Sequence, residues 1–156
     1  MQYKIRAMRI SEFNTVVRLM YDSVHTLCKN DYTEEELDAW MPKNLHTPSF
    51  FSSLTRCYAI VALDDREVVG FMSTERDGYV NRLYTRPSYA RLGVATALLE
   101  ETERWAKRRR IKYLTLEASR SAEEFYIKRG FVKVGVIKSV KNNVSFESAK
   151  MKKELK

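Results

Sequence analysis

One stretch of the sequence, residues 83–99, passes directly from a β-rich run into a long amphipathic helix, with Gly93 at the junction. A strand that turns tightly into a helix directs several unpaired backbone N–H groups at one point, where the helix dipole is also positive. We expect a pyrophosphate group to bind there, because Gly93 has no side chain to block its approach and Ala95 keeps the next turn small. The simpler alternative is a turn that needs glycine only for its backbone angles.

Two other classes of phosphate-binding loop are excluded. The sequence has no Gly-Lys-Ser or Gly-Lys-Thr triplet, which the phosphate loop of nucleotide hydrolases requires. It also lacks the Gly-x-Gly-x-x-Gly pattern of dinucleotide-binding folds. If the junction at Gly93 binds phosphate, it therefore does so as another kind of site.

Helix and strand signals alternate along the rest of the chain. Apolar residues recur at helical spacing over residues 13–27, with Ser11 as the expected N-cap, and Thr33–Glu36 and Ser121–Glu124 have the pattern of capping boxes. Strand-like runs occupy residues 3–6, 57–63, 67–73, 79–85, 113–118, 132–138 and 144–152. This order predicts a mixed α/β fold with one strand–helix–strand crossover at its centre.

Length and composition predict one domain spanning residues 1–156. Hydrophobic residues make up 44% and charged residues 31% of the chain, as in packed globular proteins. Residues 1–6 lack the apolar stretch of a signal peptide, and no run approaches the roughly 20 apolar residues of a membrane span, so we expect a cytoplasmic protein without membrane contact. Cys28 and Cys57 lack metal-site spacing and are expected to be reduced thiols.

The formal net charge of +8 favours a polyanionic partner, either nucleic acid or a ligand rich in phosphate. The densest basic run, Lys107–Arg110, follows the amphipathic helix and either complements the negative end of its dipole or contacts nucleic acid. The sequence resembles no zinc finger and no aromatic RNA-binding motif. We therefore expect no nucleic-acid partner, and a small basic nucleic-acid-binding protein stays as an alternative.

Two segments, in the right order, resemble the GNAT acetyltransferase superfamily. Residues 83–99 are similar to a strand followed by the signature Arg/Gln-x-x-Gly-x-Gly/Ala, with Gly93 and Ala95 in the two small positions. Residues 118–131 resemble the family's Ala-x-x-Phe-Tyr-x-x-x-Gly-Phe stretch. Within the family, residues 31–40 resemble the YafP-type branch of bacterial acetyltransferases.

The resemblance implies the GNAT acyl-CoA N-acyltransferase fold, which is an α/β fold of the mixed α+β type. Its central sheet of about six to seven strands is mixed, mostly antiparallel and flanked by helices. The implied function is an N-acetyltransferase that moves an acetyl group from acetyl-CoA to a primary amine by direct attack in a ternary complex, without a metal. The implied cofactor-binding residues are Leu83, Tyr84, Thr85, Arg91, Leu92, Gly93, Val94, Ala95, Thr96, Ser119 and Tyr126.

One position departs from the family signature. Its first residue, usually Arg or Gln, is Ala90 here. The backbone N–H groups from Leu92 to Thr96 do not depend on that side chain, so we keep the expectation of CoA binding. We expect Arg91 or Arg86 to supply the missing phosphate contact.

The resemblance also implies catalytic roles. Tyr126 is the candidate general acid, because the family has a Tyr four residues before its Gly-Phe pair and a phenol can protonate a departing thiolate; core packing is the alternative. The general base stays open. Glu117 and Asn81 are the candidates, Glu75 and Asp77 lie nearby, and a water chain could replace all four.

The acceptor amine, a small molecule or a peptide, is the least determined part. His25 and Tyr32 fall in the region that lines the acceptor pocket in relatives, so His25 could assist deprotonation, although a lone helical His is usually structural. Residues 29–48 should select the acceptor. Dimers are common among relatives, but the sequence leaves open whether this chain is a monomer or a homodimer. A non-catalytic acyl-CoA sensor remains the second hypothesis for function.

Overall fold

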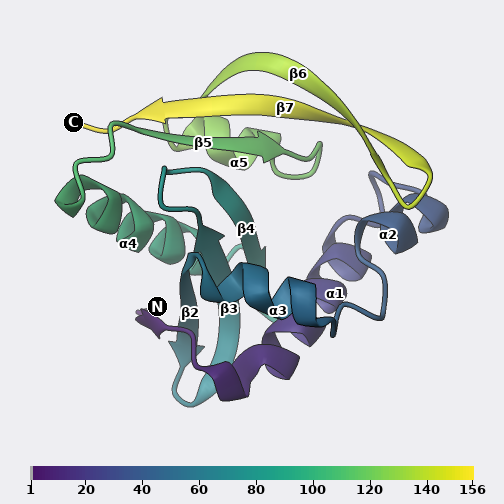
Figure 1. Cartoon of the computed structure of the whole chain (residues 1–156), viewed down its shortest axis with the longest axis horizontal. Coiled ribbons are helices and arrows are strands. Elements are labelled where there is room, and N and C mark those ends of the chain that lie inside the picture. Colours follow the sequence, from purple (N-terminus) through teal and green to yellow (C-terminus); the bar gives the residue numbers. More distant parts are fainter. Residues whose placement is uncertain (1) are drawn as a thin grey trace.

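The computed structural model describes residues 2–156, which form one α/β unit (Figure 1). In chain order the elements are β1 (Lys4–Ala7), the 3₁₀ helix η1 (Ile10–Glu12), α1 (Phe13–Leu27), α2 (Glu34–Trp40), α3 (Pro48–Thr55), β2 (Tyr58–Asp64), β3 (Glu67–Thr74), β4 (Val80–Thr85), the 3₁₀ helix η2 (Pro87–Tyr89), α4 (Val94–Arg108), β5 (Tyr113–Ala118), α5 (Glu123–Lys128), β6 (Val132–Lys141) and β7 (Val144–Glu154). The predicted strands and the central β4–α4–β5 crossover are confirmed.

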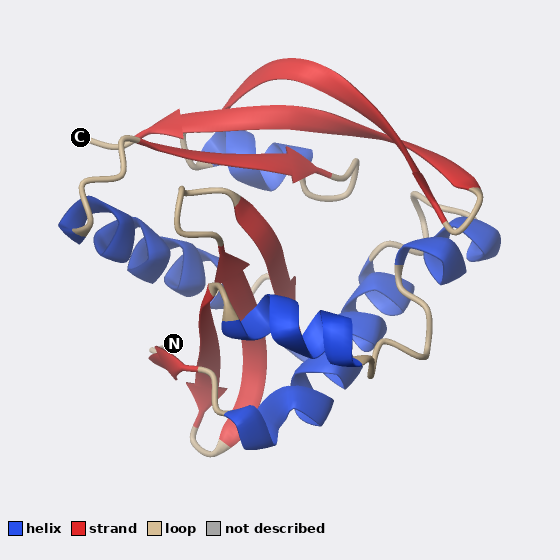
Figure 2. Ribbon diagram, in the orientation of Figure 1, coloured by secondary structure: helices blue, strands red, loops and turns tan. Residues whose placement is uncertain are grey.

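The strands divide into two antiparallel sheets. The first has the order β1-β2-β3-β4 and the second the order β5-β7-β6. They are joined by one parallel bridge between Tyr79 and Thr115, where the Thr115 N–H donates to the Gly78 carbonyl at 3.1 Å. Figure 2 shows that the strands of the second sheet cross over those of the first and diverge from them. The single predicted sheet is therefore split between β4 and β5.

The period-two alternation of β2 and β3 gives the first sheet two buried faces. Ile60 and Met72 pack in one cluster with Leu98 of α4, whereas Val61 and Phe71 pack in another with residues of α1, α2 and α3. Helix α4 thus covers one face, α1 and α3 cover the other, and α2 packs against α1 and β7. This arrangement leaves the outer edge of β4, beyond Tyr79, facing the gap between the sheets.

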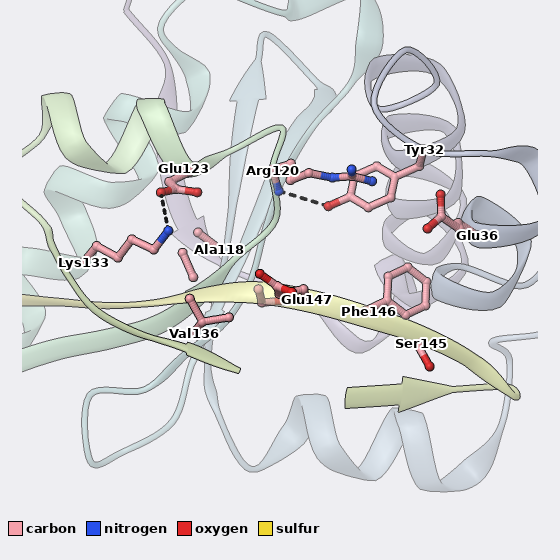
Figure 3. A pocket seen from close by; sticks show the side chains of 12 residues that line it. Tyr32, Glu36, Ala118, Arg120, Glu123, Lys133, Val136, Ser145, Phe146 and Glu147 are labelled. Atoms are coloured by element: carbon pink, nitrogen blue, oxygen red, sulfur yellow. Dashed lines mark hydrogen bonds and ion pairs between the residues drawn. The ribbon is translucent and has the colours of Figure 1, made fainter. Parts of the chain in front are cut away.

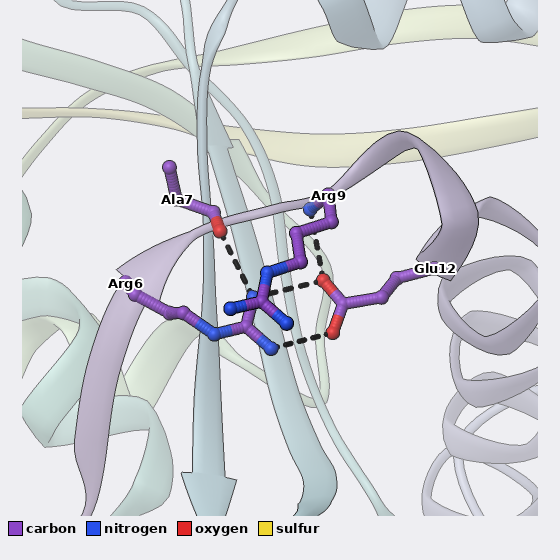
Figure 4. A network of polar contacts seen from close by, with 4 residues as sticks. All are labelled: Arg6, Ala7, Arg9 and Glu12. Atoms are coloured by element: carbon purple, nitrogen blue, oxygen red, sulfur yellow. Dashed lines mark hydrogen bonds and ion pairs between the residues drawn. The ribbon is translucent and has the colours of Figure 1, made fainter.

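The first helix begins differently from the sequence prediction. Ser11 lies inside η1 and does not cap α1. Instead the Glu12 carboxylate accepts hydrogen bonds from the backbone N–H of Arg9 at 2.8 Å and from both terminal nitrogens of Arg6 at 3.0 and 2.7 Å (Figure 4). These hydrogen bonds to Arg6 lower the pKa of Glu12 and tie β1 to the start of the helical segment.

The two predicted capping boxes have different outcomes. At α2, the Thr33 hydroxyl accepts the Glu36 N–H and the Glu36 carboxylate accepts the Thr33 N–H, so that prediction is confirmed. At α5, Ala122 is the N-cap and makes no side-chain cap, so the prediction for Ser121 is wrong. The Ser121 hydroxyl instead donates to the Asp31 carboxylate at 2.6 Å, a contact across 90 residues of sequence.

Two further features bear on partners. The basic run ends α4, where Lys107 and Arg108 occupy the last turn, and the Arg109 guanidinium lies 5.7 Å from the centre of the Trp105 ring. The run therefore complements the helix terminus, as its structural interpretation predicts. No helix within residues 2–156 has the length and apolar character needed to span a bilayer.

Candidate active site

The sheets part around a cavity of about 530 Å³. Its walls come from α1, the segment around α2, β4, the start of α4, β5, α5 and the β6–β7 hairpin. Eight residues expected at the site from the sequence line it: Asn81, Leu83, Tyr84, Thr85, Ala95, Glu117, Ser119 and Tyr126. The fold thus gathers residues from three distant segments into one cavity.

One wall contains Ala95, in the first turn of α4, whereas the other expected residues of this segment, Arg91, Leu92, Gly93, Val94 and Thr96, are outside the lining. Gly93 is the N-cap of α4 in the left-handed conformation, with φ +86°, and a Cβ placed there would meet nothing within 4 Å. The first backbone bond of the helix runs from the Ala97 N–H to the Gly93 carbonyl at 3.0 Å, so the N–H groups of residues 93–96 precede the hydrogen-bonded ladder. We call these four N–H groups the cradle. It has open space, a positive helix end and no acidic residue in the first turn, which suits a phosphate.

A guanidinium that the sequence analysis missed lies beside the cradle. Arg129 donates from Nε and Nη2 to the Thr96 hydroxyl at 3.0 and 2.7 Å, and from Nη1 to the Phe125 carbonyl at 3.1 Å. It also lies 3.9 Å from the centre of the Phe125 ring. The Thr96 side chain is therefore engaged by Arg129, and its backbone N–H is the group left for a ligand. In the sequence, Arg129 is marked only by its position directly before Gly130. Its contact with Thr96 spans 33 residues, so the sequence pattern does not reveal it.

The two arginines expected to contact phosphate have different surroundings. Arg86 donates to the Val68 carbonyl at 3.1 and 2.9 Å and pairs with Glu67 at 3.1 Å, so its guanidinium is held against β3. The expectation for Arg86 is therefore wrong. Arg91 is exposed two residues before the N-cap, with φ +62°. The adjacent Leu92 carbonyl accepts the Tyr3 hydroxyl at 2.8 Å, which fixes this loop to the start of the chain.

Tyr126 is positioned by α5 with its ring inside the core. It is 7% exposed, and the rings of Phe125 and Phe131 meet it edge-on at 5.2 and 5.3 Å. Its hydroxyl hydrogen-bonds to no other residue within 2–156, although the residue lines the cavity. Burial raises the pKa of Tyr126, so the phenol carries its proton at neutral pH.

Glu117 lies near the end of β5 and is the cavity's carboxylate. The Tyr79 hydroxyl donates to its Oε2 at 2.8 Å, and burial together with this bond raises the pKa of Tyr79. Asn81 is the extra residue of a β-bulge in β4, between the pairs Ser73–Arg82 and Thr74–Val80. Its amide donates to the Cys57 sulfur at 3.3 Å, so Asn81 has a structural contact besides lining the cavity.

Three other candidates lie away from the cavity wall. Glu75 and Asp77 belong to the β3–β4 turn, where the Asp77 carboxylate accepts the Tyr79 N–H at 3.0 Å. His25 stacks on Tyr21 at 4.0 Å, and its Nε2 is 2.8 Å from the Met41 carbonyl. These contacts assign His25 to packing between α1 and the segment after α2, and they contradict a role in deprotonation.

A smaller cavity of about 440 Å³ shares Tyr32, Ala118, Phe146 and Ser148 with the first (Figure 3). Charged side chains line it, including an ion pair between Lys133 and Glu123 at 3.3 Å. Tyr32 lines both spaces, and its hydroxyl accepts the Arg120 N–H at 3.0 Å. The second cavity contains no residue of the 83–99 segment, so the larger one is the candidate site.

Comparison with known proteins agrees with this geometry. A family model described as an acetyltransferase (GNAT) domain matches residues 28–155. The uncharacterized N-acetyltransferase YafP of Escherichia coli (strain K12) is 26% identical over 128 residues, which cover 82% of this chain and 80% of the relative. Spermidine N(1)-acetyltransferase of Thermoplasma acidophilum is 23% identical over 143 residues, 84% of this chain and 89% of the relative.

Among solved structures, a GCN5-related N-acetyltransferase from Rhodopseudomonas palustris superposes with a TM-score of 0.94 at 26% identity. The superposition covers 99% of this chain and 97% of the other. The residues matched by the family model include both the cradle and Tyr126.

Proposed function

Because the chain belongs to the GNAT acetyltransferase family, we propose that it transfers an acetyl group from acetyl-CoA directly to a primary amine, with both bound in one ternary complex. The observation that supports this most strongly is the cavity itself. It joins Ala95 in the first turn of α4, the free edge of β4, a protonated phenol and a carboxylate in one space. This composition suits acetyl transfer.

The residues present fit acetyl-CoA. The cradle would hold the pyrophosphate through four N–H groups, with the Arg129 guanidinium close by and Arg91 at the open side. The backbone of residues 83–85, at the edge of β4 that faces the gap, would hydrogen-bond the amides of the pantetheine arm as an added strand does. Bound in this way, acetyl-CoA supplies the thioester that the amine attacks.

Two proton movements accompany the transfer. A C–N bond forms, a C–S bond breaks, and the amine must lose a proton while the thiolate gains one. Glu117 would accept the amine's proton, directly or through water, since its carboxylate lines the cavity. Tyr126 would donate the proton to the sulfur, because burial keeps its phenol protonated.

The test follows release of free CoA and the mass of the acetylated product over a panel of amines. Glu117→Gln should lower kcat/KM by about 10² or more, as expected when a general base is lost. Glu75→Gln is the matched control, because Glu75 lies outside the cavity lining. Wild-type rates in Glu117→Gln would exclude it as the base, and acetyl-CoA binding without turnover of any amine would favour the sensor.

A further inference from the structure

The charges at the acceptor end of the cavity are mostly positive. This end is formed by α1, Tyr32 and Trp40, β4 and the β6–β7 hairpin. The charged residues lining the whole cavity are Arg82, Glu117 and Lys141. Glu117 already accepts the Tyr79 hydroxyl, and neither cation forms an ion pair with a residue of the described chain. The lining therefore presents two cations that form no ion pair within residues 2–156, together with one carboxylate.

Arg82 is held in place without being neutralised. Its guanidinium lies 4.8 Å from the centre of the Phe50 ring, and its contacts with the hydroxyls of Ser73 and Ser53 are long, at 3.3 and 3.4 Å. Burial lowers its pKa, and the nearby Glu75 attracts it without forming an ion pair. A desolvated charge usually has a partner in folded proteins, because the cost of removing it from water is otherwise uncompensated.

Lys141 approaches the same space from the end of β6. Its Nζ lies 5.9 Å from the centre of the Trp40 ring and 5.5 Å from that of Phe146, both of which also line the cavity. Lys141 is exposed at the rim of the cavity; desolvation lowers the pKa of its ammonium, and the Glu117 carboxylate attracts it without forming an ion pair. Arg82 and Lys141 thus reach the cavity from different sheets, with aromatic rings around them.

From these two cations we infer that the acceptor carries an anionic group, a carboxylate or a phosphate, in addition to the amine that is acetylated. The inference rests on the proposed function. The anion would bind Arg82, whose planar fork suits two parallel hydrogen bonds, and Lys141. The amine would then point towards Glu117 and the thioester. A polyamine would instead add cations to a lining that already has an excess of them, which distinguishes this site from one for spermidine.

The experiment compares matched acceptors by kcat/KM. Each L-amino acid is paired with its carboxamide, O-phosphoethanolamine is paired with ethanolamine, and spermidine is included as the cationic acceptor. We expect the anionic member of at least one pair to be preferred by tenfold or more. The amino-acid and phosphoethanolamine arms tell carboxylate from phosphate recognition.

Variants test which residues bind the anionic group of the acceptor. Arg82→Gln should raise KM for the anionic acceptor tenfold or more and change KM for the matched neutral acceptor little. Lys141→Met should have the same effect, at a position that tolerates substitution better. Lys138→Met, at an exposed lysine of β6 that does not line the cavity, is the matched control and should keep the preference. Equal or better use of carboxamides or spermidine by the wild type overturns the acceptor inference alone. Acetyl-CoA binding without turnover of any acceptor overturns the proposed function as well.

Discussion

Replacing Tyr126 with Phe separates catalysis from packing, because the substitution removes one oxygen and keeps the ring. The edge-on contacts with Phe125 and Phe131 survive, and the hydroxyl lost has no hydrogen-bond partner within residues 2–156. Such a volume-conserving change should cost less than about 1.5 kcal/mol of stability. For a domain of this size, that corresponds to a fall in Tm of no more than about 6 °C.

The effect on turnover should be much larger. Loss of a general acid lowers kcat by about 10²–10⁴, which is about 2.7–5.5 kcal/mol of transition-state stabilisation. The dissociation constant for acetyl-CoA should stay nearly unchanged, because the cradle and Arg129 are untouched. Turnover is measured with the best amine of the panel, and acetyl-CoA binding is measured by calorimetry on the same samples.

The pH dependence sharpens this test. A phenol with an ordinary pKa near 10 would make the rate fall on the alkaline side, and that limb would vanish in the variant. Burial raises the pKa of Tyr126, so this limb should lie above pH 10, and the ratio of wild-type to variant rates should be constant from pH 7 to 10. Equal rates in the two proteins would show that Tyr126 only fills the core.

Three further predictions concern binding and stability. Gly93→Asn should weaken CoA binding tenfold or more, because the Asn side chain would fill the open space of the cradle. The Tm should change little, since Asn tolerates the left-handed φ of +86°. Unchanged affinity by calorimetry would place the phosphate elsewhere. Arg129→Gln should weaken CoA binding about tenfold through loss of a charged donor, whereas Arg104→Gln, at an exposed ion pair on α4, should not. The free energy of unfolding should fall as pH rises from 10 through about 12, because burial raises the pKa of Tyr84 to about 12 and the unfolded state loses its phenol protons first. Urea titrations should show a smaller fall in Tyr84→Phe than in the wild type. An identical fall in the two proteins would refute the assignment.

The elements that could be predicted from the sequence are those determined by local interactions. Thr33 and Glu36 satisfy each other's backbone N–H groups three residues apart, so the spacing alone predicted the start of α2. Gly93 was recognisable for the same reason, because the need for a left-handed residue is set by the turn itself.

The errors concern interactions between segments far apart in the chain. Ser121 has the sequence of a cap, but its hydroxyl finds a charged acceptor in Asp31, and a hydrogen bond to a carboxylate is stronger than one to a backbone N–H. Arg129 and Arg86 could not be told apart by composition, since only the packing of α5 on α4 brings one guanidinium to Thr96. A sequence pattern contains no such distances.

The single bridge between Tyr79 and Thr115 has an energetic consequence for ligand entry. Had β4 and β5 continued as a paired ladder, a molecule entering between them would have broken main-chain hydrogen bonds, at about 1 kcal/mol each. The strands separate instead, so the ligand exchanges its own water for protein donors and acceptors without undoing any part of the folded backbone. Ligand entry between β4 and β5 therefore breaks no main-chain pairing of either sheet.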